Sequence, residues 1–315
     1  MPCYKPLKGC LVDTPEGQQI SFARKSRGKG VTLPCGRCIG CRIEKARQWA
    51  VRIMHEAKTH EQTCFLTLTF EYEPKNQSLD VKHVQTFMKA LRHHVYPKKV
   101  RYFASGEYGE MCETCGCGKK KCRKIKCGRG PYKLGRAHYH VALFGYEFKD
   151  QEFLKKENEF SLWTSKTLDK LWSHGSCTIG KVAWDSAVYV AKYTTKKITG
   201  EKAKEHYGKR KPEFATMSRK PGIGYPWFKK FRGDVYPEDE VIVNGRKTKP
   251  PRAYDKWLEQ SDPETYARVK ARREEDAERV QTRIGDHPAV AKVPASRNAH
   301  ILAAKEKIAL GKAKK

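Results

Sequence analysis

The chain has 315 residues, enough for one or two domains with a substantial hydrophobic core. Its 65 Lys and Arg against 35 Asp and Glu give a formal net charge of +30, and its 38% hydrophobic content is typical of a globular protein. No segment approaches the roughly 20 apolar residues of a membrane helix, and the first residues lack the apolar centre of a signal peptide. We therefore do not expect a secreted or membrane-spanning protein.

The charge predicts a polyanionic partner. Nucleic acid is the usual one, because each Lys or Arg that neutralises a phosphate releases a condensed counterion. A peripheral membrane protein is the competing interpretation, but it requires a basic amphipathic helix with a bulky apolar face, and the C-terminal segment offers only a weak one. The charge pattern favours nucleic acid.

The 12 cysteines fall mostly into two clusters. In a reducing compartment, clustered cysteines more often bind metal than form disulfides, and tetrahedral zinc takes four thiolates. The two predicted structural zinc sets are Cys3, Cys35, Cys38 and Cys41, and Cys112, Cys115, Cys122 and Cys127, with Cys117 as a substitute in the second. The alternative is that these are reduced thiols in turns. Cys64 and Cys177 are expected to be small core residues.

Hydrophobic periodicity predicts the regular elements in chain order. We expect helices over 40–59, from Asp80 to about 95, over 161–173 and over 185–197, and strands over 63–70, 100–104 and 138–144. Asn244-Gly245 favours a hairpin turn, and the chain from about 262 is charged and helix-prone, ending in a basic tail. Strands interleaved with helices predict an α+β fold, with one antiparallel sheet covered by helices.

His138 and His140 lie two residues apart on a predicted strand, so both imidazoles project from one face and Tyr139 from the other. Two such histidines can share a metal ion, although surface histidine pairs are also common. We expect Glu107, with Glu110 as the fallback, to add a carboxylate. Two imidazoles and one carboxylate leave coordination positions open on a metal ion. They can bind zinc, iron or manganese, whereas magnesium binds imidazole less readily.

A second candidate for chemistry lies on the helix predicted over 185–197. Tyr189, Tyr193 and Lys196 align on one stripe with Lys192 beside them, while the opposite side (Trp184, Ala187 and Ala191) can face the core. A phenol has a pKa near 10, so nucleophilic attack at neutral pH needs nearby cations and a metal-polarised electrophile. The alternative is an aromatic packing stripe.

These pieces, in this order, resemble the HUH endonucleases, whose motif is His–hydrophobic–His followed by a catalytic tyrosine. The chain is more similar still to the replication initiators of microviruses, in particular the gokushovirus-like branch. The resemblance covers roughly residues 1–230. It rests on Pro34–Arg42 with Trp49, Phe65–Thr69, Arg136–His140, Tyr189–Tyr193 with Lys196, and Pro221–Tyr225. One departure is an insertion over 112–130, which separates Glu107 from His138 by more residues than we expect of the family.

The resemblance implies an HUH-type central antiparallel sheet flanked by helices and a nickase that also rejoins strands. Mg²⁺ or Mn²⁺ on His138, His140 and Glu107 would polarise the scissile phosphate. Tyr189 or Tyr193 would then attack, leaving a 5′-phosphotyrosyl link and a free 3′-OH that primes rolling-circle synthesis. Lys192 or Lys196 would steady the developing charge.

The implied partners are a circular single-stranded DNA origin and the host polymerase and helicase, in the host cytoplasm and without a membrane. Trp163, Trp172 and Tyr225 are candidate stacking faces for the strand. The candidate DNA-contacting residues are Lys119, Lys120, Lys121, Arg123, Lys124, Arg136 and Lys197. A non-catalytic zinc-dependent nucleic-acid-binding protein and a hydrolytic metallonuclease are the alternatives.

The predicted organisation has four parts. A Cys-rich segment and an amphipathic helix occupy 1–60, and the nuclease core occupies 61–200, with the Cys-rich insertion at 112–130. An extension with a hairpin follows at 201–260, and a charged helical or mobile tail at 261–315.

Overall fold

The structure is a computed structural model that describes residues 3–15, 17–23, 27–74, 76–112, 132–157, 159–198 and 201–285. The described residues form two compact units, one comprising those up to Lys45 and from Asp255 onward, the other Ala46–Tyr254. Both helices and antiparallel strands are present, so the predicted α+β class is confirmed. In the described part of the chain, no helix has the length and apolarity needed to cross a bilayer.

The unit Ala46–Tyr254 is built on a seven-stranded sheet in which neighbouring strands run antiparallel. The predicted central antiparallel sheet is therefore confirmed. Its strands, in spatial order, are β10 (Phe214–Met217), β5 (Arg101–Cys112), β6 (Tyr132–Phe144), β4 (Thr63–Thr69), β9 (Cys177–Gly180), β8 (Phe160–Ser165) and β7 (Gln151–Glu157).

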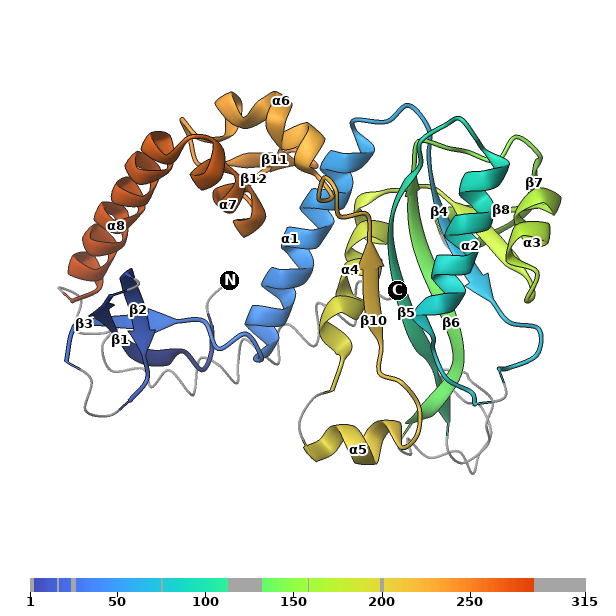
Figure 1. Cartoon of the computed structure of the whole chain (residues 1–315), viewed down its shortest axis with the longest axis horizontal. Helices are drawn as coiled ribbons and strands as arrows, with labels where there is room; N and C mark the ends of the chain where they lie inside the picture. Colours follow the sequence, from blue (N-terminus) through green and yellow to red (C-terminus); the bar gives the residue numbers. More distant parts are fainter. Residues whose placement is uncertain are drawn as a thin grey trace. The chain divides into compact units, whose positions relative to one another are not determined.

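Helices cover both faces of this sheet (Figure 1). On one face lie α2 (Val81–His94) and α3 (Lys166–Trp172); on the other lie α4 (Trp184–Lys196) and the part of α1 (Ile39–Ala57) that belongs to this unit. The alternation in β4 explains both layers: Leu66 and Leu68 pack towards α2, whereas Phe65 packs towards α4. The strand predicted over 63–70 is confirmed.

Two helix starts follow from capping side chains. The Asp80 carboxylate accepts a hydrogen bond from the amide of Lys82, as expected for the start of α2. Ser165 accepts from the amide of Leu168, which fixes the start of α3 at Lys166. The predicted helix over 161–173 is therefore wrong in its first part, because the β-forming segment Phe160–Ser165 pairs with β7 as a strand.

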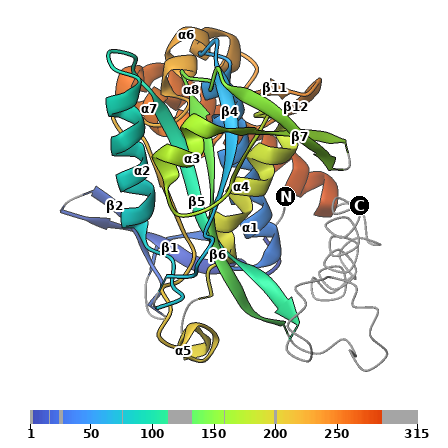
Figure 2. The same ribbon diagram turned by 90° about the vertical axis from the view of Figure 1, so that its right-hand side faces the viewer.

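Strands β5 and β6 run well beyond their predicted ends and form a long hairpin (Figure 2). Glu107 pairs directly with His138, and the register shifts by a bulge or irregularity between Tyr108 and Glu110. The insertion thus joins two paired strands at the tip of their hairpin, and its residues 113–130 lie outside the described part of the chain. Its length does not separate Glu107 from His138 in space.

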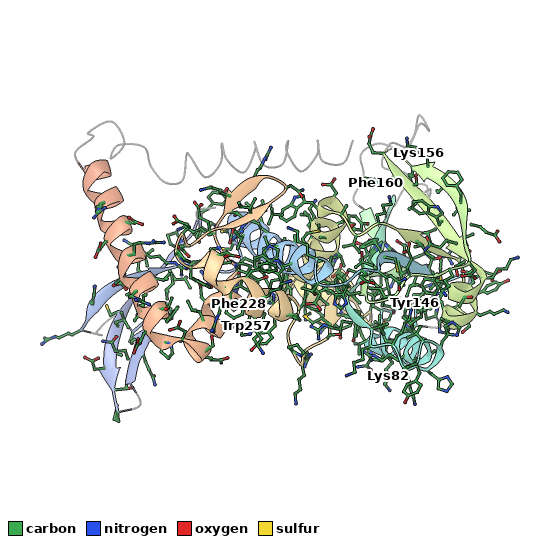
Figure 3. All side chains as sticks on the ribbon, turned by 90° about the horizontal axis from the view of Figure 1, so that it is seen from above. Lys82, Tyr146, Lys156, Phe160, Phe228 and Trp257 are labelled. Atoms are coloured by element: carbon green, nitrogen blue, oxygen red, sulfur yellow. The ribbon has the colours of Figure 1, made fainter. Side chains whose placement is uncertain are left out.

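Smaller elements complete this unit: α5 (Glu201–Tyr207), α6 (Tyr225–Val235), β11 (Val241–Val243) and β12 (Arg246–Thr248). Asn244 and Gly245 join the last two strands with positive φ angles of 50° and 70°, so the predicted hairpin is confirmed. The β7–β8 hairpin carries exposed side chains, among them Lys156 and Phe160 (Figure 3).

The other unit contains a three-stranded antiparallel sheet of order β2-β1-β3. Its strands are β1 (Leu7–Thr14), β2 (Gly17–Ser21) and β3 (Lys29–Leu33). This unit also contains the end of α7 (Arg252–Ser261), a helix that we did not predict. It contains α8 (Pro263–Gly285) as well, which begins in the segment predicted to be helix-prone. Arg273 on α8 forms two hydrogen bonds of 3.0 Å with Asp255 on α7.

Candidate metal centre and adjacent tyrosine

The H-x-H pair lies on β6, near the middle of the sheet. His138 and His140 project towards α4, while Tyr139 projects towards α2, where its hydroxyl accepts from the amide of Asp80 at 3.0 Å. The opposite orientation of these side chains follows from the two-residue repeat of a strand. The orientation predicted for the two imidazoles is therefore the one observed.

Glu107 on β5 joins the two histidines, because it is the cross-strand partner of His138. Its Oε1 lies 2.5 Å from Nε2 of His138 and 2.9 Å from Nε2 of His140, and the residue is 3% exposed. One donor atom from each of the three residues lies within 4.8 Å of the other two. The structure thus brings the favoured carboxylate to the imidazoles, while the side chain of Glu110 lies outside those described.

Nδ1 of each imidazole, the nitrogen that faces away from Glu107, also has a hydrogen-bond partner. Nδ1 of His138 lies 3.2 Å from the carbonyl oxygen of Arg136, and Nδ1 of His140 lies 3.2 Å from Oγ1 of Thr67. Since a carbonyl only accepts, Nδ1 of His138 donates to it, and Nε2 of the same ring faces Glu107. Such outer contacts orient metal-ligating histidines in general.

This donor set fits a divalent cation. A nitrogen lone pair and a carboxylate oxygen repel each other at hydrogen-bond distance unless a proton or a metal ion lies between them. Burial raises the pKa of Glu107, but its hydrogen bonds with His138 and His140 outweigh this effect and lower the pKa to about 2. At neutral pH the carboxylate is therefore ionised and able to act as a ligand.

Tyr189 reaches the same oxygen from α4. Its hydroxyl donates to Oε1 of Glu107 at 2.9 Å, and its ring packs edge-on to His140 with centroids 4.9 Å apart. Ala187 and Ala191 are fully buried, as expected for the core side of this helix, whereas Tyr189 is 40% exposed. The phenol oxygen thus borders the cluster and is not enclosed in apolar packing.

The rest of the predicted stripe is only partly described. Tyr193 and Lys196 lie on α4, but their side chains fall outside those described. A four-residue step along a helix rises about 6 Å, so the backbone of Tyr193 lies one turn beyond that of Tyr189. Lys192 is half-buried, and Lys197, at the C-terminal cap of α4, is exposed.

The candidate DNA contacts have different outcomes. Arg136 donates to the carbonyl oxygens of Phe70 (2.5 Å) and Glu71 (2.7 Å), so its guanidinium connects β6, two residues before His138, to the segment that follows β4. Trp172 is wrong as a stacking face: it is 1% exposed, and its indole donates to the carbonyl of Thr69 at 2.6 Å, because it lies on the core side of α3. Lys119, Lys120, Lys121, Arg123 and Lys124 lie outside the described residues.

Of the two predicted zinc sets, the structure describes the side chains of the first only. The sulfurs of Cys3, Cys35, Cys38 and Cys41 lie within 4.8 Å of one another. The side chain of Cys112, and all of Cys115, Cys117, Cys122 and Cys127, lie outside the described part of the structure. Cys64 and Cys177 are buried, which confirms them as core residues.

Two features escaped the sequence analysis. Thr67 lies on the same face of β4 as Phe65, but its contact with His140 depends on the β4–β6 register, which pairs these two residues. Glu56 on α1 is fully buried and accepts a hydrogen bond from Arg101 on β5, which lies 45 residues later in the chain. The sequence indicated the Glu56–Arg101 contact only through the position of Glu56, a charged residue on the apolar side of a predicted helix.

Comparison with known proteins places this site in a family context. The family described as Replication-associated protein ORF2/G2P matches residues 63–114 and 119–198, which include Glu107, both histidines and Tyr189. The replication-associated protein ORF2 of Spiroplasma virus 4 is 28% identical over 89% of this chain and 88% of its own length. The chain is related to microvirus replication-associated proteins.

Two further relatives support this relationship. The replication-associated protein VP4 of Bdellovibrio phage phiMH2K is 28% identical over 88% of this chain and 85% of its own length. The replication-associated protein ORF4 of Chlamydia phage 1 is 27% identical over 72% of this chain and 53% of its own length. No solved structure matches. The resemblance to microvirus replication proteins is thereby confirmed.

Proposed function

We propose that this protein initiates rolling-circle replication of a circular single-stranded phage genome by nicking one DNA strand with Tyr189. The observation that carries this proposal is the convergence of three side chains on one atom. The hydroxyl of Tyr189 and the Nε2 atoms of His138 and His140 lie 2.9, 2.5 and 2.9 Å, respectively, from Oε1 of Glu107. A phosphate bound at this cluster would therefore lie beside the phenol oxygen.

Glu107, His138 and His140 would hold a divalent ion such as Mg²⁺ or Mn²⁺, which supplies a Lewis acid for a phosphate oxygen. Thr67 and the Arg136 carbonyl keep both imidazoles in the orientation that this role requires. Tyr189 presents its hydroxyl from a helix packed on the sheet, so the nucleophile is positioned before DNA arrives.

The reaction is a transesterification. The Tyr189 hydroxyl loses its proton and its oxygen forms a bond to phosphorus. The bond from phosphorus to the 3′ oxygen breaks, and the leaving 3′ oxygen takes up one proton, so the proton count is unchanged. The product is a 5′-phosphotyrosyl link with a free 3′-OH, which a host polymerase and helicase would use to copy the circle. Because the new phosphodiester is similar in energy to the old one, the reverse reaction closes a strand without ATP.

The second tyrosine of the motif would serve strand transfer. Tyr193 lies one helical turn from Tyr189 on α4 and would attack the regenerated origin after one round of synthesis. Lys192 and Lys196 of the same helix would offset the charge that develops on the transferring phosphate.

Binding of the DNA strand is supported by the net charge of +30 and by a cavity at the start of α4. The cavity has a volume of about 500 Å³ and is lined in part by Trp184, Arg47, Arg246 and Lys247. An indole with several cations offers both base stacking and phosphate neutralisation, which is how sequence-tolerant sites hold single strands.

The test is to trap the covalent product. Labelled single-stranded fragments that tile the phage's own genome are incubated with the protein and Mn²⁺, and the adduct is digested and weighed. We expect a nucleotide attached to the peptide that carries Tyr189, and no adduct from H138A/H140A. Tyr96→Phe is the matched control, since this tyrosine is 83% exposed beyond the end of α2.

Other outcomes would replace the proposal. Cleavage without a covalent adduct would indicate a metallonuclease that uses water. Tight binding of every fragment without cleavage would indicate a non-catalytic zinc-dependent nucleic-acid-binding protein. An adduct on a residue other than the two tyrosines would also overturn it.

A further inference from the structure

The N-terminal sheet does not bury side chains of its own. Among the described residues from Cys3 to Cys38, every one is exposed or half-buried, although they form three hydrogen-bonded strands. A small sheet without buried apolar side chains is marginal in water and generally needs a cross-link or a metal ion.

Four cysteines meet at the junction between this sheet and a helix. Cys3 precedes β1, Cys35 and Cys38 lie between β3 and α1, and Cys41 lies in the first turn of α1. All are free and half-buried, and their sulfur atoms lie within 4.8 Å of one another. Cys3 is far in sequence from Cys35, Cys38 and Cys41. Its sulfur therefore joins theirs only because the β1–β3 sheet folds back on itself.

The sulfur spacing fits a single metal ion. Zinc–sulfur bonds of about 2.3 Å arranged as a tetrahedron place the sulfurs about 3.8 Å apart. The sulfurs of Cys3 and Cys38 are 3.8 Å apart, far beyond the length of a disulfide bond. In a four-iron cluster each thiolate binds a different iron, which requires a wider spacing than a group confined to 4.8 Å.

Backbone amides already point at these sulfurs. The amide of Tyr4 donates to the sulfur of Cys38 at 3.4 Å, that of Cys35 to Cys3 at 3.2 Å, and that of Cys38 to Cys35 at 3.3 Å. Such hydrogen bonds stabilise thiolates, the form that binds metal. The loop thus directs backbone donors at the sulfurs of Cys3, Cys35 and Cys38, which a set of reduced thiols in a turn does not require.

We propose that Cys3, Cys35, Cys38 and Cys41 bind one structural Zn²⁺, and that this ion holds the β1–β3 sheet to the start of α1. Four thiolates fill the tetrahedral coordination of zinc and leave no position for substrate. The ion therefore contributes folding free energy to the N-terminal sheet and takes no part in the chemistry at Glu107.

The first test measures zinc in a protein whose other metal-binding candidates have been removed. The background carries H138A/H140A and serine at Cys112, Cys115, Cys117, Cys122 and Cys127. After zinc loading and dialysis we expect one zinc per chain, lost on adding C35S/C38S and retained on adding C10S. Cys10 is the matched control because it is a half-buried cysteine of the same sheet, on β1, outside the four-sulfur group.

A spectroscopic measurement on the same background avoids mutation of the four cysteines. Cobalt loading should give the intense visible bands of a tetrahedral ion together with thiolate charge-transfer absorption. Equal zinc content with and without C35S/C38S, or a cobalt spectrum lacking thiolate bands, overturns the site.

Hydrogen exchange tests the structural role. Chelation should remove amide protection from β1 and β3 while leaving β4 and β6 protected. Unchanged protection in β1 and β3 would show that the ion does not support the sheet. None of these readouts depends on DNA cleavage, so failure of the proposed nickase would leave them intact.

Discussion

The hydroxyl of Tyr189 lies 2.9 Å from Oε1 of Glu107, although 82 residues separate them in the chain. Glu107 belongs to the β5–β6 ladder and Tyr189 to a helix packed on that ladder. The proposed nucleophile and the proposed metal ligand therefore lie on two elements that pack against each other. This arrangement fixes their distance before any substrate binds.

Replacement of Tyr189 by Phe should reduce covalent adduct formation by at least about 1,000-fold, because only the nucleophilic oxygen is removed. Stability should change little, since the residue is 40% exposed. Adduct yield in a single turnover and a urea melt measure the two effects. Wild-type adduct yield in Y189F, with loss in Y193F, would assign the first cut to Tyr193.

Tyr139 should behave in the opposite way. Its hydroxyl accepts from the Asp80 amide at 3.0 Å and lies 2.8 Å from Nδ1 of His83, on the face of β6 away from the histidine pair. Y139F should lower the free energy of unfolding by about 1–3 kcal/mol, because these groups lose a buried partner. Its adduct yield should match wild type below the melting transition; a loss comparable to that of Y189F would contradict this assignment.

Thr67 should control metal affinity without being a ligand. T67V removes the oxygen 3.2 Å from Nδ1 of His140 and should weaken Mn²⁺ binding by about 10–100-fold, as loss of an outer partner typically does. T69V is the matched control, since Thr69 lies on the same face of β4 but donates to the carbonyl of Ser176. Calorimetric titration with Mn²⁺ compares them, and equal affinities would refute the role.

The buried carboxylate of Glu56 should make stability depend on pH. Burial raises its pKa, but hydrogen bonds with His60, Arg101 and the Gly224 amide outweigh this and lower the pKa below its usual value. Its contribution is therefore fully present above the unfolded pKa of about 4.3 and is lost as the pH falls through the folded value.

At pH 7, E56Q should cost about 3–5 kcal/mol, because it leaves Arg101 without its buried partner. The difference from wild type should shrink as the pH falls below about 4. Urea unfolding across this range tests both statements. E152Q is the control, since Glu152 is an exposed residue 3.9 Å from Lys166 and should change stability little.

Short-range patterns predicted much of the fold. The alternation in Thr63–Thr69 and the H-x-H spacing fix which face each side chain takes, because a strand repeats every two residues. The helix carrying Tyr189 followed from its apolar repeat, and the start of α2 from Asp80. These features depend on neighbours in the chain, which the sequence displays directly.

The contacts that the sequence did not predict depend on how segments distant in the chain align with one another. The pairing of Glu107 with His138 required the alignment of β5 on β6, which the intervening insertion concealed. The contacts of Arg136 with the end of β4 and of Glu56 with Arg101 likewise join segments whose approach no local pattern encodes. The segment Phe160–Ser165 became a strand because β7 was available to pair with it.

The position of the insertion at a hairpin tip has an evolutionary consequence. Glu107 and His138 occupy the same rung of the β5–β6 ladder, so the length of the connection between Cys112 and Tyr132 does not enter the distance between them. The length and sequence of that connection can therefore change during evolution while the cluster of Glu107, His138 and His140 keeps its dimensions.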